Sequence, residues 1–202
     1  MIAIVDYGMG NLRSVAKALE RFGYPCCITS DPGVVESASG VILPGVGAFG
    51  EAVHNLSRSG LTDQIRAAAT DGRPFLGICL GYQMLFDASE EAPGVPGLGI
   101  FQGKVRRFGA GLKVPHMGWN SVEFIRPDPV IAGQSDPAWL YFVHSYYVEP
   151  EDSTLIIGRC GYGISFAAAI ARGNLFACQF HPEKSQSAGL SIIQRFGERA
   201  CV

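Results

Sequence analysis

The chain has 202 residues, of which 48% are hydrophobic and 17% charged, and this length and composition suit one compact domain spanning residues 1–202. A formal net charge of −2 argues against general binding to nucleic acids. Six cysteines occur without the paired spacing or histidine clusters of a metal site, so we expect no metal, and we expect no cofactor. Because one of them, Cys79, is a candidate reactive thiol, we expect a reducing, cytoplasmic location. The N-terminal segment has no basic region, and no stretch approaches the ~18 apolar residues of a membrane span, so nothing marks the chain for export or for a membrane.

Short apolar runs alternate with helical patterns in the first part of the chain. Ile2–Asp6 is predicted as a strand, and Asn11–Phe22 as a helix because its apolar residues recur at helical spacing. Val41–Leu43 is predicted as a strand, Leu61–Thr70 as a helix and Phe75–Ile78 as a further strand. This βαβ alternation predicts an α/β fold with a mainly parallel central sheet flanked by helices.

Two glycines, Gly45 and Gly47, surround Val46 directly after the Val41–Leu43 strand. Glycines around one residue permit its peptide to flip, which would turn an N–H toward or away from a developing oxyanion. The alternative is an ordinary loop after a strand. The residues by themselves leave both interpretations open.

Cys79 lies where the Phe75–Ile78 strand is predicted to turn sharply into a helix. Gly77 and Gly81 on either side let the backbone fold tightly, as in the nucleophile elbow of α/β hydrolases. A helix N-terminus favours the thiolate form, and the amide of Leu80 would point at an oxyanion. The alternative is a buried structural cysteine. Flanking glycines have no purpose around such a residue, so we predict a catalytic nucleophile.

After Pro96-Gly97 the pattern changes to strand-like pieces. They are Val105–Phe108, Val122–Ile125, Tyr141–Val148, Ile156–Tyr162, Ile164–Ala171 and Leu175–Phe180, and Ala188–Phe196 is predicted as a closing helix. These pieces predict an antiparallel extension that carries the residues after Phe180 back to Cys79. We find no linker of domain-separating length and no internal repeat.

A base for the cysteine follows the last of these strands, in His181-Pro182-Glu183. In an extended backbone, residues two apart face the same side, so Glu183 would hold the imidazole of His181. An isolated surface histidine is the alternative, but Pro182 and the following carboxylate argue against it. Cys79, His181 and Glu183 are therefore predicted as nucleophile, base and orienting carboxylate.

The G-x-C-x-G-x-Q and H-P-E elements resemble the class I (triad) glutamine amidotransferases, which release ammonia from glutamine through a cysteinyl thioester. Four further segments narrow the resemblance to the glutaminase subunits of imidazole glycerol phosphate synthase. They are Asp6–Leu12, Pro44–Phe49, Val114–Asn120 and Tyr141–Tyr147. The resemblance spans Ile2 to about Phe196 and implies the flavodoxin-like class I amidotransferase fold.

The resemblance also implies roles for individual residues. It favours the oxyanion role for Gly45, Val46 and Gly47 together with Leu80. The amino-acid end of glutamine would be bound by Gln83, Ser145 and Tyr146, with a solvated residue as the alternative for Gln83. Candidate residues for a partner interface are Asn11, Met117, Trp119, Tyr141 and Lys184. The alternative for the two interface aromatics is an ordinary place in the core.

The implied partner is the (βα)₈-barrel cyclase subunit of imidazole glycerol phosphate synthase, which would form a heterodimer with this chain. It would use the ammonia to convert PRFAR to imidazole glycerol phosphate and AICAR in histidine biosynthesis. Two alternatives stay open. The chain would serve another synthase, such as those for anthranilate, GMP or pyridoxal phosphate, or it would be a catalytically silent binding subunit with the same fold.

Overall fold

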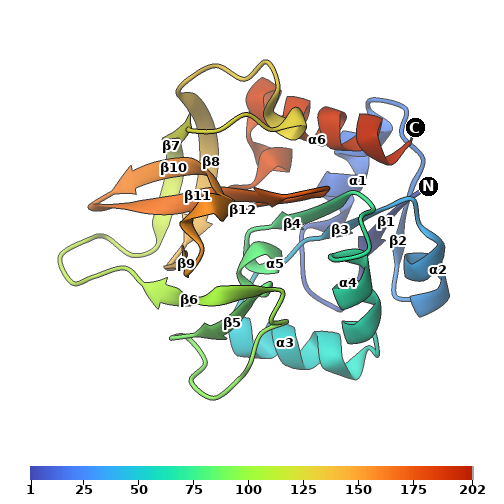
Figure 1. Ribbon diagram of the computed structural model, residues 1–202, viewed down its shortest axis with the longest axis horizontal. Coiled ribbons are helices and arrows are strands. Elements are labelled where there is room, and N and C mark those ends of the chain that lie inside the picture. The colour runs from blue at the N-terminus through green and yellow to red at the C-terminus, as the bar shows by residue number, and fades with distance from the viewer. Residues whose placement is uncertain (202) are drawn as a thin grey trace.

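Five parallel strands form one end of a larger sheet in residues 1–201, the part of the chain that this computed structural model describes (Figure 1). Their order is β2 (Cys26–Thr29), β1 (Ile2–Val5), β3 (Gly40–Leu43), β4 (Phe75–Ile78) and β12 (Leu175–Cys178), and each neighbouring pair is parallel. Every residue of β1, β3, β4 and β12 is buried, as parallel strands are when helices cover both faces. The predicted α/β fold is confirmed.

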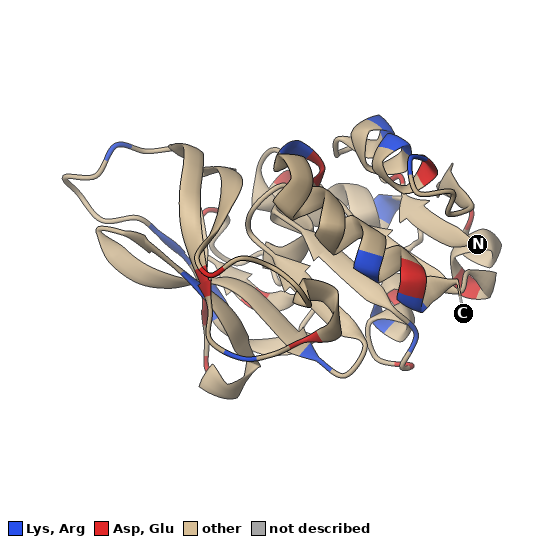
Figure 2. Cartoon of the chain, turned by 90° about the horizontal axis from the view of Figure 1, so that it is seen from above, with Lys and Arg blue, Asp and Glu red and all other residues tan. Residues whose placement is uncertain are grey.

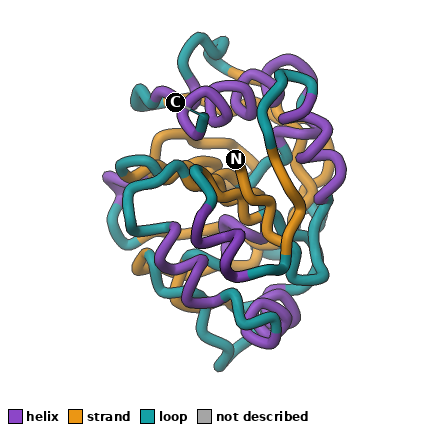
Figure 3. The backbone as a smooth tube through the Cα atoms, turned by 90° about the vertical axis from the view of Figure 1, so that its right-hand side faces the viewer, coloured by secondary structure: helices purple, strands orange, loops and turns teal. Residues whose placement is uncertain are grey.

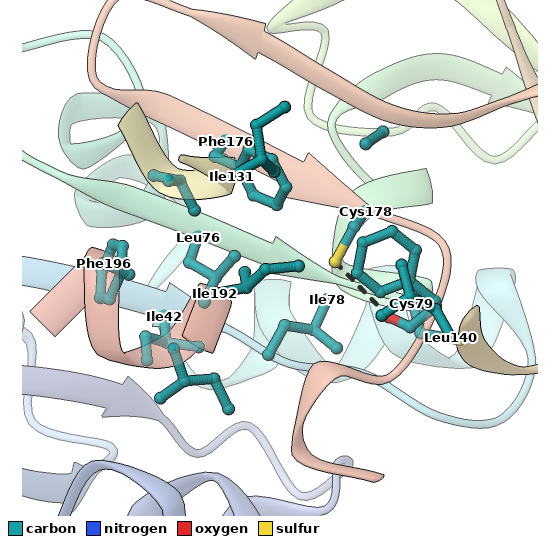
Figure 4. Packing of buried hydrophobic residues seen from close by; sticks show 14 of the residues in the cluster. Ile42, Leu76, Ile78, Cys79, Ile131, Leu140, Phe176, Cys178, Ile192 and Phe196 are labelled. Atoms are coloured by element: carbon teal, nitrogen blue, oxygen red, sulfur yellow. Dashed lines mark hydrogen bonds between the residues drawn. The ribbon is translucent and has the colours of Figure 1, made fainter. Parts of the chain in front are cut away.

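Helices lie on both sides of these strands (Figure 3). They are α1 (Leu12–Glu20), α2 (Pro32–Ser37), α3 (Phe49–Arg58), α4 (Thr62–Ala68), α5 (Leu80–Gln83) and α6 (Gln186–Ala200). Alternate strand residues face opposite sides, so Ile4 packs in the cluster that contains α1 and α6, whereas Val5 packs with α2, α3 and α4. In Figure 4, Ile42 of β3 lies against Ile192 and Phe196 of α6.

An antiparallel extension continues the sheet beyond β12, as predicted. Its strands follow in the order β11 (Ile164–Arg172), β10 (Ile156–Tyr162), β7 (His116–Phe124) and β8 (Ala138–His144). A branch is formed by β9 (Tyr146–Pro150), β6 (Phe101–Arg107) and β5 (Phe86–Ser89). Short 3₁₀ turns span Pro129–Ile131, Ser153–Leu155 and Pro182–Lys184. The extension therefore joins the parallel core through β12 (Figure 1).

The prediction of a single strand over Tyr141–Val148 was wrong. β8 ends at His144 and pairs with β7, whereas β9 begins at Tyr146 and pairs with β6 and β11. The chain changes strand partners at Ser145, which the strand-like pattern of the sequence does not reveal. The predicted strand over Leu175–Phe180 is likewise shorter and ends at Cys178.

The apolar pattern also does not predict β2, α2, α3 or β5. β2 lies at an edge of the sheet with partly buried residues, so its pattern is weak. The short helix α2 has a signal that could have found it, because Asp31 accepts a bond from the Gly33 N–H at 2.8 Å and Pro32 occupies the first turn.

Basic and acidic residues are interspersed over the elements shown in Figure 2 and do not gather by sign. This distribution agrees with the small net charge of −2. Among residues 1–201, no helix is both long enough and apolar enough to cross a membrane.

Candidate active site

Cys79 occupies a sharp corner between β4 and α5. Its φ of 54° and ψ of −107° are strained for a residue with a side chain, at a cost of about 1–3 kcal/mol. The Cys79 N–H donates to the Cys178 carbonyl at 2.8 Å, and the Cys79 carbonyl accepts from the Gln83 N–H at 3.2 Å. The predicted strand-to-helix corner is present, but α5 has only 4 residues, so its dipole favours a thiolate less than a long helix would.

Gly81 allows this corner to approach the end of β3. A Cβ at position 81 would lie 1.9 Å from the Leu43 carbonyl oxygen, so no larger residue fits without moving backbone. The corner is held against the strand by the same close approach that requires the glycine.

We expect Gly81→Ala to destabilise the protein by about 3 kcal/mol, because the added methyl overlaps a backbone carbonyl that cannot rotate away. Urea unfolding measures this change in the free energy of unfolding. The control is Gly161→Ala, where a Cβ meets no atom within 4 Å in the described residues and the effect is expected within ~0.5 kcal/mol. Equal stability of the two variants would contradict the close packing of the corner.

His181 and Glu183 form a buried pair after β12. Nδ1 of His181 lies 2.9 Å from Oε1 of Glu183, and both side chains are 1% exposed. The same carboxylate oxygen accepts a bond from the Asn11 side-chain amide at 3.3 Å. The expected contact forms, but the reason given for it was wrong, because Glu183 lies in the 3₁₀ turn Pro182–Lys184 and not in extended backbone.

The backbone of His181 is fixed by β8 and by a residue that the sequence did not single out, Ser185. The His181 N–H donates to the Tyr141 carbonyl at 2.9 Å. The Ser185 hydroxyl donates to the His181 carbonyl at 2.6 Å and accepts from the Tyr141 N–H at 2.9 Å. Tyr141 therefore connects β8 to the histidine through its main chain.

The charge state of His181 follows from its neighbours. Burial by itself would lower the pKa of His181, but Cys79 and Glu183, through hydrogen bonding and charge, raise this pKa to about 10. Nε2 of His181 makes no hydrogen bond within residues 1–201, so the effect of Cys79 comes from the proximity of its sulfur to the ring. An imidazolium is favoured, with Nε2 free to exchange a proton.

A histidine whose folded-state pKa lies above its ordinary value of 6.5 stabilises the fold fully below that value, and this stabilisation is lost as pH rises through about 10. The stability gap between wild type and His181→Asn is therefore expected to be larger near pH ~6 than near pH ~10, by as much as about 4 kcal/mol. Urea unfolding at both pH values measures the gap. The exposed His54→Asn is the control and should show no such change; a constant gap for His181→Asn would mean a neutral imidazole in the folded chain.

Cys79 and His181 line one cavity of about 260 Å³, which has room for a free amino acid. Six of the other predicted site residues line it too: Val46, Gly47, Leu80, Gln83, Ser145 and Tyr146. Sequence reasoning missed Glu91, whose carboxylate accepts a bond from the Phe49 N–H at 2.8 Å and can pair with an ammonium group. Among the described residues, no cluster of His, Cys, Asp and Glu side chains is arranged to hold a metal ion.

The loop after β3 is hydrogen-bonded to the Leu80 amide, which was expected to face an oxyanion. The Leu80 N–H donates to the Gly45 carbonyl at 3.3 Å, so it does not point freely into the cavity. A Cβ at position 45 would lie 2.6 Å from the Tyr7 hydroxyl, and Gly47 has a φ of 102°. Releasing the Leu80 N–H therefore requires the loop peptide to turn, as glycines on both sides of Val46 permit.

The Tyr146 carbonyl orients several side chains around the cavity. It accepts bonds from the Gln83 side-chain amide at 3.0 Å and from Nδ1 of His144 at 2.8 Å. Because a carbonyl can only accept, His144 carries its proton on Nδ1, and its Nε2 accepts from Nδ1 of His116 at 2.9 Å. Gln83 is 4% exposed, so the alternative of a solvated residue is wrong.

The family described as "Glutamine amidotransferase class-I" matches residues 3–199. The chain belongs to the class-I glutamine amidotransferase family. This amidotransferase is 55% identical to the "Imidazole glycerol phosphate synthase subunit HisH" of Moorella thermoacetica, over 98% of this chain and 94% of that protein. It is 50% identical to the protein of the same name from Syntrophotalea carbinolica, over 98% of this chain and all of that protein.

Solved structures share the fold of this amidotransferase at low sequence identity. A structure titled "Crystal structure of glutamine amidotransferase" superimposes with a TM-score of 0.78 at 20% identity, covering 100% of both chains. "Structure of PurLQS from Thermotoga maritima" superimposes with a TM-score of 0.75 at 19% identity, covering 96% of each chain. The predicted class I amidotransferase fold is therefore confirmed.

The candidate interface residues of this amidotransferase come from β7, from β8, from the residue before α1 and from the 3₁₀ turn after His181. Trp119 of β7 is 44% exposed and packs edge-on against Tyr141 of β8, with ring centroids 6.1 Å apart. Met117, two residues away on the same strand, is 63% exposed. Asn11 bonds Glu183, as described above, and Lys184 belongs to the same 3₁₀ turn as Glu183. The alternative of a core aromatic is wrong for Trp119, while Tyr141 is half-buried.

Proposed function

We propose that this chain hydrolyses glutamine to glutamate and ammonia, as the glutaminase subunit of imidazole glycerol phosphate synthase. The observation that carries the proposal is Cys79 in a strained corner, sharing one cavity with His181, whose Nδ1 is held by Glu183. Two relatives that carry the name of this subunit are 55% and 50% identical over 98% of the chain, and they support the choice of pathway.

In the proposed reaction, the Cys79 thiolate attacks the side-chain amide carbon of glutamine. His181, protonated on Nε2, gives that proton to the departing nitrogen, so ammonia leaves and a thioester remains. The neutral imidazole then takes a proton from water, and the hydroxide formed attacks the thioester carbonyl. Glutamate leaves, and the thiolate and imidazolium are restored. Glu183 keeps the imidazole in one orientation through both steps.

The oxyanion of each tetrahedral intermediate needs N–H donors. We assign this role to the Leu80 amide and to an amide of Gly45–Gly47 once the loop has turned and released Leu80. For substrate binding, the Glu91 carboxylate and Oε1 of Gln83, which is free among the described residues, suit the α-ammonium at the amino-acid end of glutamine. The Ser145 and Tyr146 main chain suits the α-carboxylate. The four proposed substrate-binding residues, Gln83, Glu91, Ser145 and Tyr146, line the same cavity as Cys79.

The ammonia must reach an acceptor before it is protonated in bulk water. We propose that Asn11, Met117, Trp119, Tyr141 and Lys184 contact a (βα)₈-barrel cyclase subunit, which uses the ammonia to convert PRFAR to imidazole glycerol phosphate and AICAR. The lyase step belongs to that partner. We propose no nucleic-acid or membrane partner, one domain over residues 1–202, and a cytoplasmic location, because a cysteine nucleophile needs a reducing compartment.

The test is to mix the purified chain with the cyclase subunit, or with the synthase subunits for anthranilate, GMP or pyridoxal phosphate, and to measure glutamine hydrolysis with and without each acceptor substrate. We expect stimulation by the cyclase with PRFAR only. Stimulation by a different synthase would instead assign the chain to the pathway of that synthase. Absence of glutamine hydrolysis with every partner would favour a silent binding subunit.

A further inference from the structure

A buried glutamine, Gln179, lies beside the cysteine for a topological reason. β4 and β12 are parallel neighbours in which Ile78 pairs with Cys178, so the next residues along the two strands are Cys79 and Gln179. The Gln179 side chain is 0% exposed, and its backbone N–H donates to the Ala168 carbonyl at 2.9 Å. The sheet register therefore brings a polar side chain from the far end of the sequence to the nucleophile.

The hydrogen bonds around Gln179 fix which end of its amide faces the sulfur. The Tyr146 carbonyl can only accept, so the Gln83 atom that meets it is the amide nitrogen. That nitrogen has a second hydrogen, which it donates to Oε1 of Gln179 at 2.9 Å. The remaining end of Gln179 is its NH₂ group, and Nε2 lies 3.6 Å from Sγ of Cys79.

A donor on sulfur favours the thiolate, because an N–H bonds a charged acceptor more strongly than a neutral thiol. The nearby imidazolium of His181 favours a thiolate through its charge, but a helix dipole and a second hydrogen bond to the sulfur contribute little here. The helix α5 has only 4 residues, and Nε2 of His181 makes no hydrogen bond within residues 1–201. Gln179 is the side chain that bonds the sulfur in the described structure.

We propose that the Gln179 side chain donates a hydrogen bond to Sγ of Cys79, which favours the thiolate and holds the sulfur at the cavity. The inference rests on the proposed function only in taking Cys79 as the nucleophile. Gln83 has a part in it as well, because its amide locks Gln179 in the donating orientation.

The test is the pH dependence of Cys79 alkylation by iodoacetamide in the full chain without partner or glutamine, followed by peptide mass spectrometry. In Gln179→Met, which keeps the length of the side chain and removes the donor, the pH of half-maximal rate is expected to rise by about one unit. The rate below that pH is expected to fall about tenfold, while the high-pH plateau is retained.

The matched control is Gln134→Met, which removes glutamine bonds to the Ala188 carbonyl and the Ser191 hydroxyl and does not line the cavity. It should leave the alkylation profile unchanged. If Gln179→Met does not fold, Gln179→Asn, whose shorter amide withdraws from the sulfur, is expected to shift the profile in the same direction. An unshifted profile in a folded Gln179 variant would overturn the inference without bearing on glutamine hydrolysis itself.

Discussion

Cys79→Ala is expected to abolish glutamine hydrolysis, with a loss of at least about 10⁴-fold, while the complex still makes imidazole glycerol phosphate from added ammonia. The reason is that no other cysteine lines the cavity in the described residues, and alanine there removes only the sulfur. The two measurements are glutamine-dependent and ammonia-dependent turnover by the same preparation. Their divergence separates loss of the nucleophile from loss of the fold or of the interface.

The matched control is Cys160→Ala, a cysteine of β10 that is 3% exposed and outside the cavity. It should retain glutamine-dependent turnover, as should replacements of Cys26, Cys27, Cys178 and Cys201. Glutamine turnover that persists in Cys79→Ala would show that Cys79 is not the nucleophile. Loss of ammonia-dependent turnover in the same variant would instead point to a damaged complex.

The second large effect is expected on the rate of glutamine hydrolysis when the partner subunit binds. The chain by itself should hydrolyse glutamine at least about 10²-fold more slowly than the complex with its acceptor substrate, because the Leu80 N–H is bonded to the Gly45 carbonyl. One missing oxyanion donor costs a factor of this size. Steady-state rates of glutamate formation, with and without cyclase and PRFAR, measure the stimulation.

Lys184→Ala and Tyr141→Ala are expected to weaken this stimulation, or to release ammonia into solution, more than they lower stability. Lys184 shares a turn with Glu183, and the Tyr141 main chain bonds His181, so both connect the interface to the site. Lys104→Ala, at an exposed position on β6, is the control and should leave stimulation unchanged. A full glutaminase rate in the isolated chain would exclude gating by the loop.

The reactive residues were predictable because each is marked by its neighbours in the sequence. Cys79 lies between glycines, and Glu183 follows His181 at a spacing that suits contact in a strand or in a turn. Ser185 and Glu91 carry no such mark, since their roles arise from contacts with β8 and with the start of α3. No sequence pattern gives the state of the Gly45 carbonyl, because one loop sequence supports both peptide orientations.

The fold was predictable where buried strands read as continuous apolar runs, as in β3 and β4. The fold was less predictable where a strand is only partly buried or where the chain changes from one strand partner to another. β2 at the sheet edge and the break at Ser145 belong to this group, since edge position and strand pairing are properties of the assembled sheet.

The pairing of β12 with β4 also sets the order in which a newly made chain becomes active. Cys79 depends on the carbonyl of Cys178, and its histidine lies three residues further on, so neither is available until residues 175–181 have joined the sheet. Contacts this distant in sequence form late, after the intervening strands have been synthesised. A nascent or prematurely terminated chain therefore has its thiol but no assembled site, and does not consume glutamine before it is complete enough to dock.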